Sequence, residues 1–188
     1  YTGAASGHSV RRLRSGYTGD IMRVRRASDD VEADVGFDSI NLLSLTSPIS
    51  NASDAQSYTD LSDFVDHTGT PTDAFVSTWY DQAASLDAVQ TTSTLQAQVY
   101  DATNGLVTEN GNPALFFDGT ATSGNALYVE APGYGQTDTR YTSYVARMTQ
   151  DAGGGSSNYH NTIMFMQNAP TVPSNFMQVY TFNASNSI

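Results

Sequence analysis

The feature that most constrains this fold is an apolar residue at every second position. From 31 to 37 the apolar residues are separated by acidic residues or glycine. A period of two is typical of a β-strand with one buried face. Residues 21–26 form a second strand-like run, and a turn-like segment at 27–30 joins the two. The sequence therefore predicts a β-hairpin over 21–37.

Further runs rich in β-branched and aromatic residues predict more strands, and turn pairs such as Asn104-Gly105 separate them. Leu61, Phe64 and Val65 have the spacing of one short amphipathic helix, expected to cap an open end of a sandwich. Many strands with almost no helix favour antiparallel sheets packed face to face. We expect one all-β sandwich domain over 1–188, with further strands at 74–80, 88–92, 114–117, 127–130, 141–148, 162–166 and 176–182.

The charge of the chain argues against nucleic acid as a partner. Eight arginines and no lysine stand against 19 acidic residues, for a formal net charge of -11. Nucleic-acid binding needs clustered cationic side chains. One cluster exists, and we expect nearby carboxylates to neutralise it through bidentate pairs. The cluster comprises Arg11, Arg12, Arg14, Arg23, Arg25 and Arg26, and the carboxylates are Asp20, Asp29, Asp30, Glu32, Asp34 and Asp38.

The composition bears on the compartment in which the protein functions. No run approaches the roughly 18 apolar residues of a membrane span, so none is expected. The chain has no cysteine, so stability outside a cell would depend on packing, ions or oligomerisation. It begins with Tyr1. We expect a processed or excised piece of a longer virion or extracellular surface protein, and an oligomer.

Three segments together carry a family resemblance. Residues 9–19, running into 21–30, resemble the opening of the catalytic domain of the arabinofuranosidase B family. Residues 75–82 resemble the Tyr-Asp-Gln segment of that family, although Ala-Ala-Ser-Leu at 83–86 replaces the usual Ser-Gly-Asn-Gly. Residues 110–119 resemble the strand entry of laminin-G-like and concanavalin-A-like modules.

The resemblance covers 9–119 and implies a concanavalin-A-like jelly roll. Similar segments occur in bacterial surface proteins and phage structural proteins, so the fold does not fix the function. Enzymes of the family take their nucleophile and acid from later parts of a longer domain. Neither residue can be matched here. The three glutamates, Glu32, Glu109 and Glu130, are interpreted as surface carboxylates.

The best candidate binding site is Trp79-Tyr80-Asp81-Gln82, at the expected end of a strand. Aromatic faces bury the C–H patches of sugars, while a carboxylate and an amide bond their hydroxyl groups. The other interpretation is a structural corner. In that case Trp79 fills the core, and Asp81 caps the next turn by accepting from backbone N–H groups.

A calcium site is a further hypothesis. Asp29, Asp30 and Asp34, or Asp118 with the region of Thr120, could supply the oxygen ligands that Ca²⁺ prefers. The spacing fits no EF-hand loop. The three histidines lack the paired spacing of a zinc site.

Three functions remain open. The leading hypothesis is a non-catalytic virion module, such as a phage tail-fibre or capsid-appendage domain, that contacts host glycan or neighbouring subunits. The second is a glycoside hydrolase fragment of the arabinofuranosidase type, with catalytic carboxylates beyond Ile188. The third is a decoration protein with no ligand.

Overall fold

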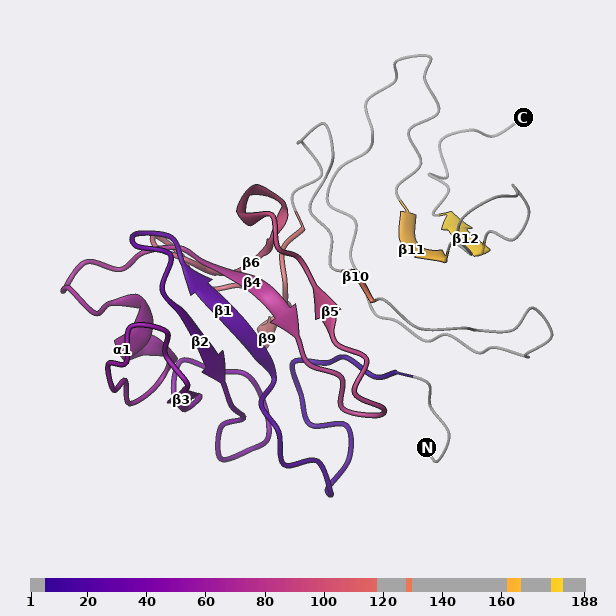
Figure 1. Cartoon of the computed structure of the whole chain (residues 1–188), viewed down its shortest axis with the longest axis horizontal. Helices are drawn as coiled ribbons and strands as arrows, with labels where there is room; N and C mark the ends of the chain where they lie inside the picture. The colour runs from indigo at the N-terminus through magenta and orange to yellow at the C-terminus, as the bar shows by residue number, and fades with distance from the viewer. Residues whose placement is uncertain (1–5, 118–127, 130–161, 167–176, 181–188) are drawn as a thin grey trace, which may run out of the picture. The chain divides into compact units, whose positions relative to one another are not determined.

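A computed structural model describes residues 6–117, 128–129, 162–166 and 177–180 (Figure 1). The chain divides into two compact units, Tyr1–Tyr134 and Gly135–Ile188. In the second unit, β11 (Thr162–Met166) pairs with β12 (Met177–Tyr180) in antiparallel orientation. The expectation of one domain over 1–188 stays a prediction.

The described elements of the first unit are mostly short strands. They include one α-helix and one turn of 3₁₀ helix. In chain order they are β1 (Met22–Arg26), β2 (Glu32–Val35), β3 (Ile49–Ser50), α1 (Leu61–Val65), β4 (Ala74–Trp79), β5 (Ala88–Val89), η1 (Ser93–Leu95), β6 (Ala97–Asp101), β7 (Gly105–Leu106), β8 (Thr108–Glu109), β9 (Asn112–Pro113) and β10 (Tyr128–Val129). The all-β class with one short α-helix is confirmed for this part of the chain.

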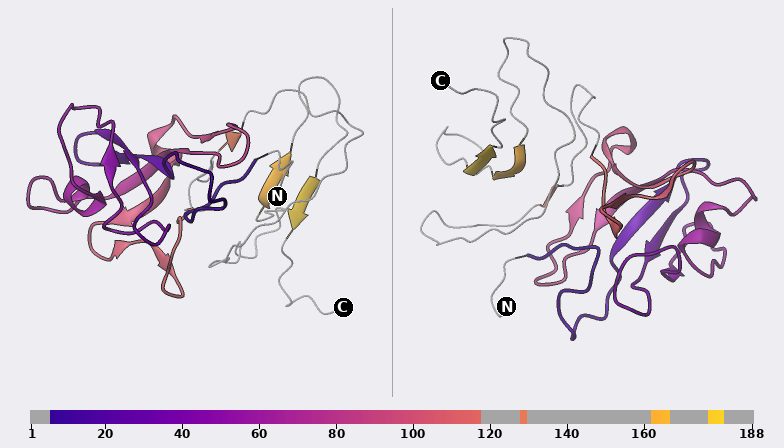
Figure 2. Two further views of the ribbon diagram at one scale, coloured as in Figure 1. Left: turned by 90° about the horizontal axis from the view of Figure 1, so that it is seen from below. Right: turned by 180° about the vertical axis from the view of Figure 1, so that it is seen from behind.

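The main sheet is antiparallel and forks at β4. Its strand order is β10-β5-β4-β1-β2-β3, and β6 and β7 branch from β4. One edge of β4 pairs with β1 along its whole length. On the other edge, residues 74–76 pair with β6, and residues 78–79 pair with β5. Figures 1 and 2 show β1 next to β2 from several sides.

The predicted hairpin over 21–37 is confirmed as β1 and β2. Met22 faces Val35 and Val24 faces Ala33 across the pair, so the apolar positions of both strands share one face. Asp30 adopts a φ of 58° in the connecting turn, a left-handed conformation that aspartate tolerates better than most residues. The period of two thus fixes the face that is buried.

The buried face packs against α1 and the loops around it. Leu61, Phe64 and Val65, the three residues that predict the helix, are all buried in the same core as β1 and β2. Asp60 caps the helix by accepting a hydrogen bond from the backbone N–H of Asp63. The helix was predicted at the right place, and its role is to complete this core.

One charged side chain, Arg26, lies inside that core with 2% of its surface exposed. Its guanidinium donates to both carboxylate oxygens of Asp29, at 3.0 and 2.8 Å. It also donates to the carbonyl of Phe64 at 2.7 Å and to the hydroxyl of Tyr58 at 3.2 Å. The rings of Tyr58 and Phe64 lie against the same cation. Arg26 therefore ties β1 to α1 and to the loop before it.

The opposite face of the sheet carries paired charges. Arg23 bonds Glu32 at 2.9 Å and Asp34 at 2.8 Å, all three on β1 and β2. Arg25 bonds Asp30 at 2.7 Å. The expected neutralisation is therefore confirmed for the arginines of β1, although only Arg26 forms a bidentate pair with a carboxylate.

Some sequence predictions are wrong or remain outside the described residues. The strand expected at 114–117 is only an isolated bridge between Phe116 and Gln98, while β9 lies just before it. β6 was not predicted, although its buried Ala97 and Val99 are separated by the more exposed Gln98. The strand expected at 141–148 lies outside the described residues. A second packed sheet, as a jelly-roll sandwich requires, is not confirmed.

We predict that Arg26→Met lowers the free energy of unfolding by roughly 3 kcal/mol, because the buried partners of the guanidinium lose their donors. Arg14→Met is the matched control. Arg14 is exposed, so a change within about 0.5 kcal/mol is expected. Urea denaturation of both variants measures the difference. Equal losses would contradict the central role of Arg26.

Candidate functional site

The predicted segment 79–82 leaves the end of β4 and enters a loop. Its backbone is held from both sides, since Tyr80 N–H donates to the carbonyl of Ile21 and Gln82 N–H to that of Gly7. The four side chains of the segment point to different neighbours and do not form one binding surface.

Asp81 acts as the structural corner that the sequence offered as an alternative. Its two carboxylate oxygens accept from the backbone N–H groups of Gly7, Ala83, Ala84 and Leu86, at 2.7 to 2.9 Å. Burial would raise the pKa of this carboxyl group, but the four donors outweigh it and the pKa lies below its usual value. Asp81 is therefore an ionised centre that closes the loop.

Gln82 is 1% exposed and fastens the N-terminal segment to this loop. Its amide oxygen accepts from Leu13 N–H at 2.7 Å. Its amide nitrogen donates to the carbonyls of Ser9 and Arg11, each at 3.0 Å. These bonds use the polar atoms with which Gln82 was expected to bind sugar hydroxyls.

Trp79 is partly buried and packs against the core, as the structural interpretation predicts. Its ring lies 5.8 Å from that of His8 between centroids. The indole Nε1 is buried and has no hydrogen-bond partner within the described part of the chain. Burial lowers the pKa of His8, although Asp81, the Leu86 carbonyl and Asp87 oppose that shift.

Tyr80 points across the sheet toward Asp34 on β2. Its hydroxyl donates to Asp34 Oδ1 at 2.6 Å, and burial together with this carboxylate raises the pKa of the phenol. Asp34 also accepts from Arg23 and Asn51, each at 2.8 Å. This network fixes the ring of Tyr80 beside the end of β1.

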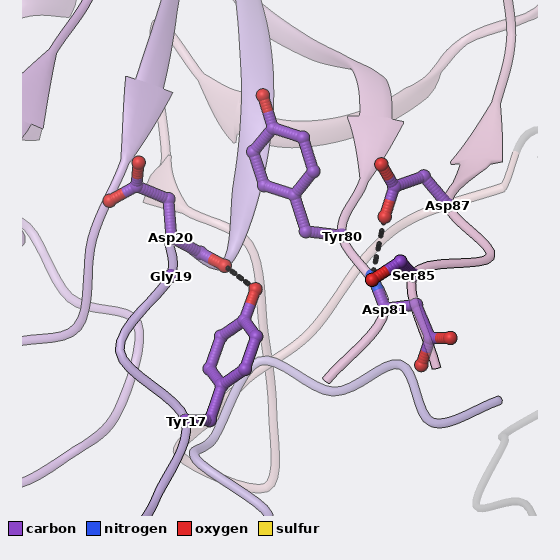
Figure 3. Close-up of a pocket in the computed structure, with 7 residues that line it drawn as sticks. All are labelled: Tyr17, Gly19, Asp20, Tyr80, Asp81, Ser85 and Asp87. Carbon is purple, nitrogen blue, oxygen red and sulfur yellow. Dashed lines mark hydrogen bonds between the residues drawn. The ribbon is translucent and has the colours of Figure 1, made fainter. Parts of the chain in front are cut away.

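A pocket of about 290 Å³ lies where this loop meets the chain entering β1. Its lining comes from two distant segments, 17–20 and 80–87. Figure 3 shows Tyr17 and Tyr80 between Asp20 on one side and the loop of Ser85 and Asp87 on the other. The residues that line it are Tyr17, Gly19, Asp20, Tyr80, Asp81, Ser85 and Asp87. We call it the Tyr17/Tyr80 pocket.

The walls of the Tyr17/Tyr80 pocket are fixed by local bonds. The hydroxyl of Tyr17 donates to the carbonyl of Asp20 at 2.8 Å. A Cβ atom at Gly19 would lie only 2.6 Å from that hydroxyl oxygen, so the position requires glycine for this ring placement. On the other wall, Asp87 Oδ1 accepts from Asp81 N–H at 2.8 Å.

The electrostatic environment differs between the two walls. Burial raises the pKa of Asp20, the nearby charge of Asp34 adds to this, and a hydrogen bond from Ser50 opposes it. The ionised form of Asp20 is therefore disfavoured, whereas that of Asp81 is stabilised by its donors. The charge of Asp20 is therefore less compensated than that of Asp81.

The structure does not bring the calcium candidates together. Asp29 binds Arg26, Asp30 binds Arg25, and Asp34 binds Arg23. Within the described residues, no group of three or more His, Cys, Asp or Glu side chains is arranged to hold a metal ion. The other calcium candidates, Asp118 and Thr120, lie outside the described residues.

The sequence predicted only part of the pocket lining. Tyr80 and Asp81 belong to the predicted segment, whereas Tyr17, Asp20 and Asp87 were not predicted as site residues; Asp20 was expected only to neutralise nearby arginines. No local pattern could have joined them, because pairing of β1 with β4 brings residues about sixty positions apart into one place.

Comparisons with known proteins give no relative from which a function could be transferred. No family model, no curated protein and no solved structure matches this chain. In the part of the chain that the structure describes, no helix is long and apolar enough to cross a membrane.

We predict that Asp81→Asn lowers the free energy of unfolding at neutral pH by roughly 2 kcal/mol, because an amide cannot accept from all four donors. The lowered pKa adds a pH dependence. The contribution of ionised Asp81 is complete above the ordinary pKa of 3.8 and is lost as the pH falls through the lower folded value. Denaturation at several pH values should therefore show the difference between variant and parent shrinking in acid.

Asp101→Asn is the control for that experiment. Asp101 also accepts backbone N–H bonds, from Thr103 and Asn104, but in an exposed turn. A smaller loss is expected there. A constant difference between the Asp81 variant and its parent at all pH values would contradict the proposed role of the charge.

Proposed function

We propose that this chain is a non-catalytic recognition module of a virion or extracellular surface protein, and that it contacts glycan at the Tyr17/Tyr80 pocket. A phage tail-fibre or capsid appendage is the setting we propose, with neighbouring subunits as further partners. We also propose that its sheet belongs to a concanavalin-A-like jelly roll. The antiparallel sheet with one polar and one apolar face supports such an architecture.

The observation that carries the glycan proposal is the pairing of two tyrosines with carboxylates in one pocket. Tyr17 and Tyr80 offer rigid aromatic surface, and Asp20 and Asp87 offer hydrogen-bond acceptors on either side (Figure 3). Sugars present C–H patches and hydroxyl groups at close spacing, which this combination can satisfy. Because both rings are held by hydrogen bonds, little side-chain freedom is lost on binding.

One observation favours the enzyme alternative. Asp20 and Asp81 line the same pocket and have pKa values displaced in opposite directions, as an acid and a base of a glycosidase would. Against this, both oxygens of Asp81 are bound to backbone N–H groups, and Figure 3 shows its carboxylate turned away from the tyrosines. A nucleophile or base needs a free oxygen, so we favour recognition.

We predict that the purified chain binds oligosaccharides on a glycan array, and that Tyr17→Ala weakens this binding at least about fivefold, because an aromatic contact surface is lost. Phe117→Ala is the matched control, since Phe117 is an exposed aromatic residue outside the pocket lining. Calorimetry with the strongest array ligand gives the ratio. An array with no signal, together with a large symmetric contact in an assembled particle, would favour the ligand-free decoration protein.

The enzyme alternative has its own test. We predict no turnover of an aryl arabinofuranoside by the purified chain, because Asp81, the partner that Asp20 would need in an acid and base pair, has both oxygens bound to backbone N–H groups. Release of the phenol that is abolished by Asp20→Asn, with the fold retained by circular dichroism, would replace the recognition proposal by a hydrolase.

A further inference from the structure

The charge of the Tyr17/Tyr80 pocket limits which sugars it can take. Three of its seven lining residues are aspartates, and no arginine, lysine or histidine is among them. The other lining groups are two tyrosines, a serine and a glycine. The inference below rests on the proposed function, because it concerns the ligand of the same pocket.

Arg14, Arg23 and His8 lie outside the lining of the pocket. Arg23 is held by Glu32 and Asp34 on the sheet face. Arg14 lies close enough to influence the pKa of Tyr17, but it does so less than any of the three aspartates that act on that residue. The ring of His8 packs against Trp79 and is hydrogen-bonded to the carbonyl of Leu86, and burial lowers its pKa. None of these groups lines the pocket.

The three aspartates differ in how much negative charge they present. Asp81 directs its charge to four backbone N–H groups. Asp87 accepts one such bond and is otherwise exposed, so it can receive a second donor. Asp20 lies near Asp34, and burial raises its pKa, so a donor or cation from a ligand would stabilise its ionised form. Asp20 and Asp87 thus flank the two tyrosines with unmet acceptor capacity.

We infer that the pocket selects a sugar unit without negative charge, and that it binds an amino sugar with a free ammonium group more tightly than the neutral sugar. An ammonium group beside Asp20 or Asp87 would donate to that carboxylate and offset its negative charge. Uronic acids and sulfated or sialylated sugars meet like charge with no cation to compensate, which disfavours them.

The test compares three tetrasaccharides of the same length against the full 188-residue chain: glucosamine, N-acetylglucosamine and galacturonic acid oligomers. Calorimetry at about pH 6 and low salt keeps the amino groups protonated and the screening weak. We expect the glucosamine oligomer to bind roughly three- to tenfold more tightly than its acetylated form, and the galacturonate oligomer to bind weakest.

Two variants assign the effect to the pocket. Asp20→Asn and Asp87→Asn should each reduce the preference for glucosamine toward unity while binding of the acetylated oligomer persists. Asp66→Asn, an exposed aspartate outside the lining, should leave the preference unchanged. Raising the salt concentration should reduce the preference in the parent chain.

The outcomes separate this inference from the proposed function. Binding of the galacturonate oligomer as tightly as the other two, or a preference that survives both pocket variants, overturns the inference and leaves glycan recognition standing. If none of the three oligomers binds and a glycan array is also silent, glycan recognition fails and the inference fails with it.

Discussion

The main sheet depends on pairing the positive charges of three arginines in its central strand, β1. β1 lies between β2 and β4, so the polar ends of Arg23, Arg25 and Arg26 must find partners within reach of the sheet. Arg26 faces the core and requires Asp29, a backbone carbonyl and a tyrosine hydroxyl to remain charged there. The other two face the opposite side and require acidic partners on β2 and in the turn after β1. The acidic residues of the hairpin are thus a condition for its strand pairing.

Local patterns predicted the elements that depend on local physics. The hairpin follows from a period of two, and α1 follows from the spacing of Leu61, Phe64 and Val65. Even the neutralisation of β1 could be anticipated, since the carboxylates are close in sequence. In β6, the apolar Ala97 and Val99 on either side of Gln98 could have indicated a strand from the sequence. For Phe116 the local sequence misleads. It has strand propensity, but only a single bridge forms because pairing depends on neighbours distant in sequence.

The candidate site also could be predicted only as far as residues close in sequence determine it. Segment 79–82 was rightly singled out as chemically rich, but sequence could not decide whether its polar atoms face a ligand or the backbone. Asp81 and Gln82 bind seven backbone groups that mostly belong to distant or looped chain. Of the segment, Tyr80 offers its ring to the pocket, where it is joined by Tyr17 from segment 9–19, which had been noted only for its family resemblance.

The fork at β4 divides the sheet into parts of unequal strength. β6 is joined to β4 by a ladder that spans three residues of β4, whereas β5 is joined by only two residue pairs at Thr78 and Trp79. Opening of the β5 branch breaks few backbone bonds and leaves the β1–β4 ladder intact, so it costs less than global unfolding. The loop that carries Ser85 and Asp87 lies on this weaker branch. The wall of the pocket formed by that loop therefore depends for its position on the hydrogen bonds of Asp81 and Asp87 more than on the β4–β5 ladder.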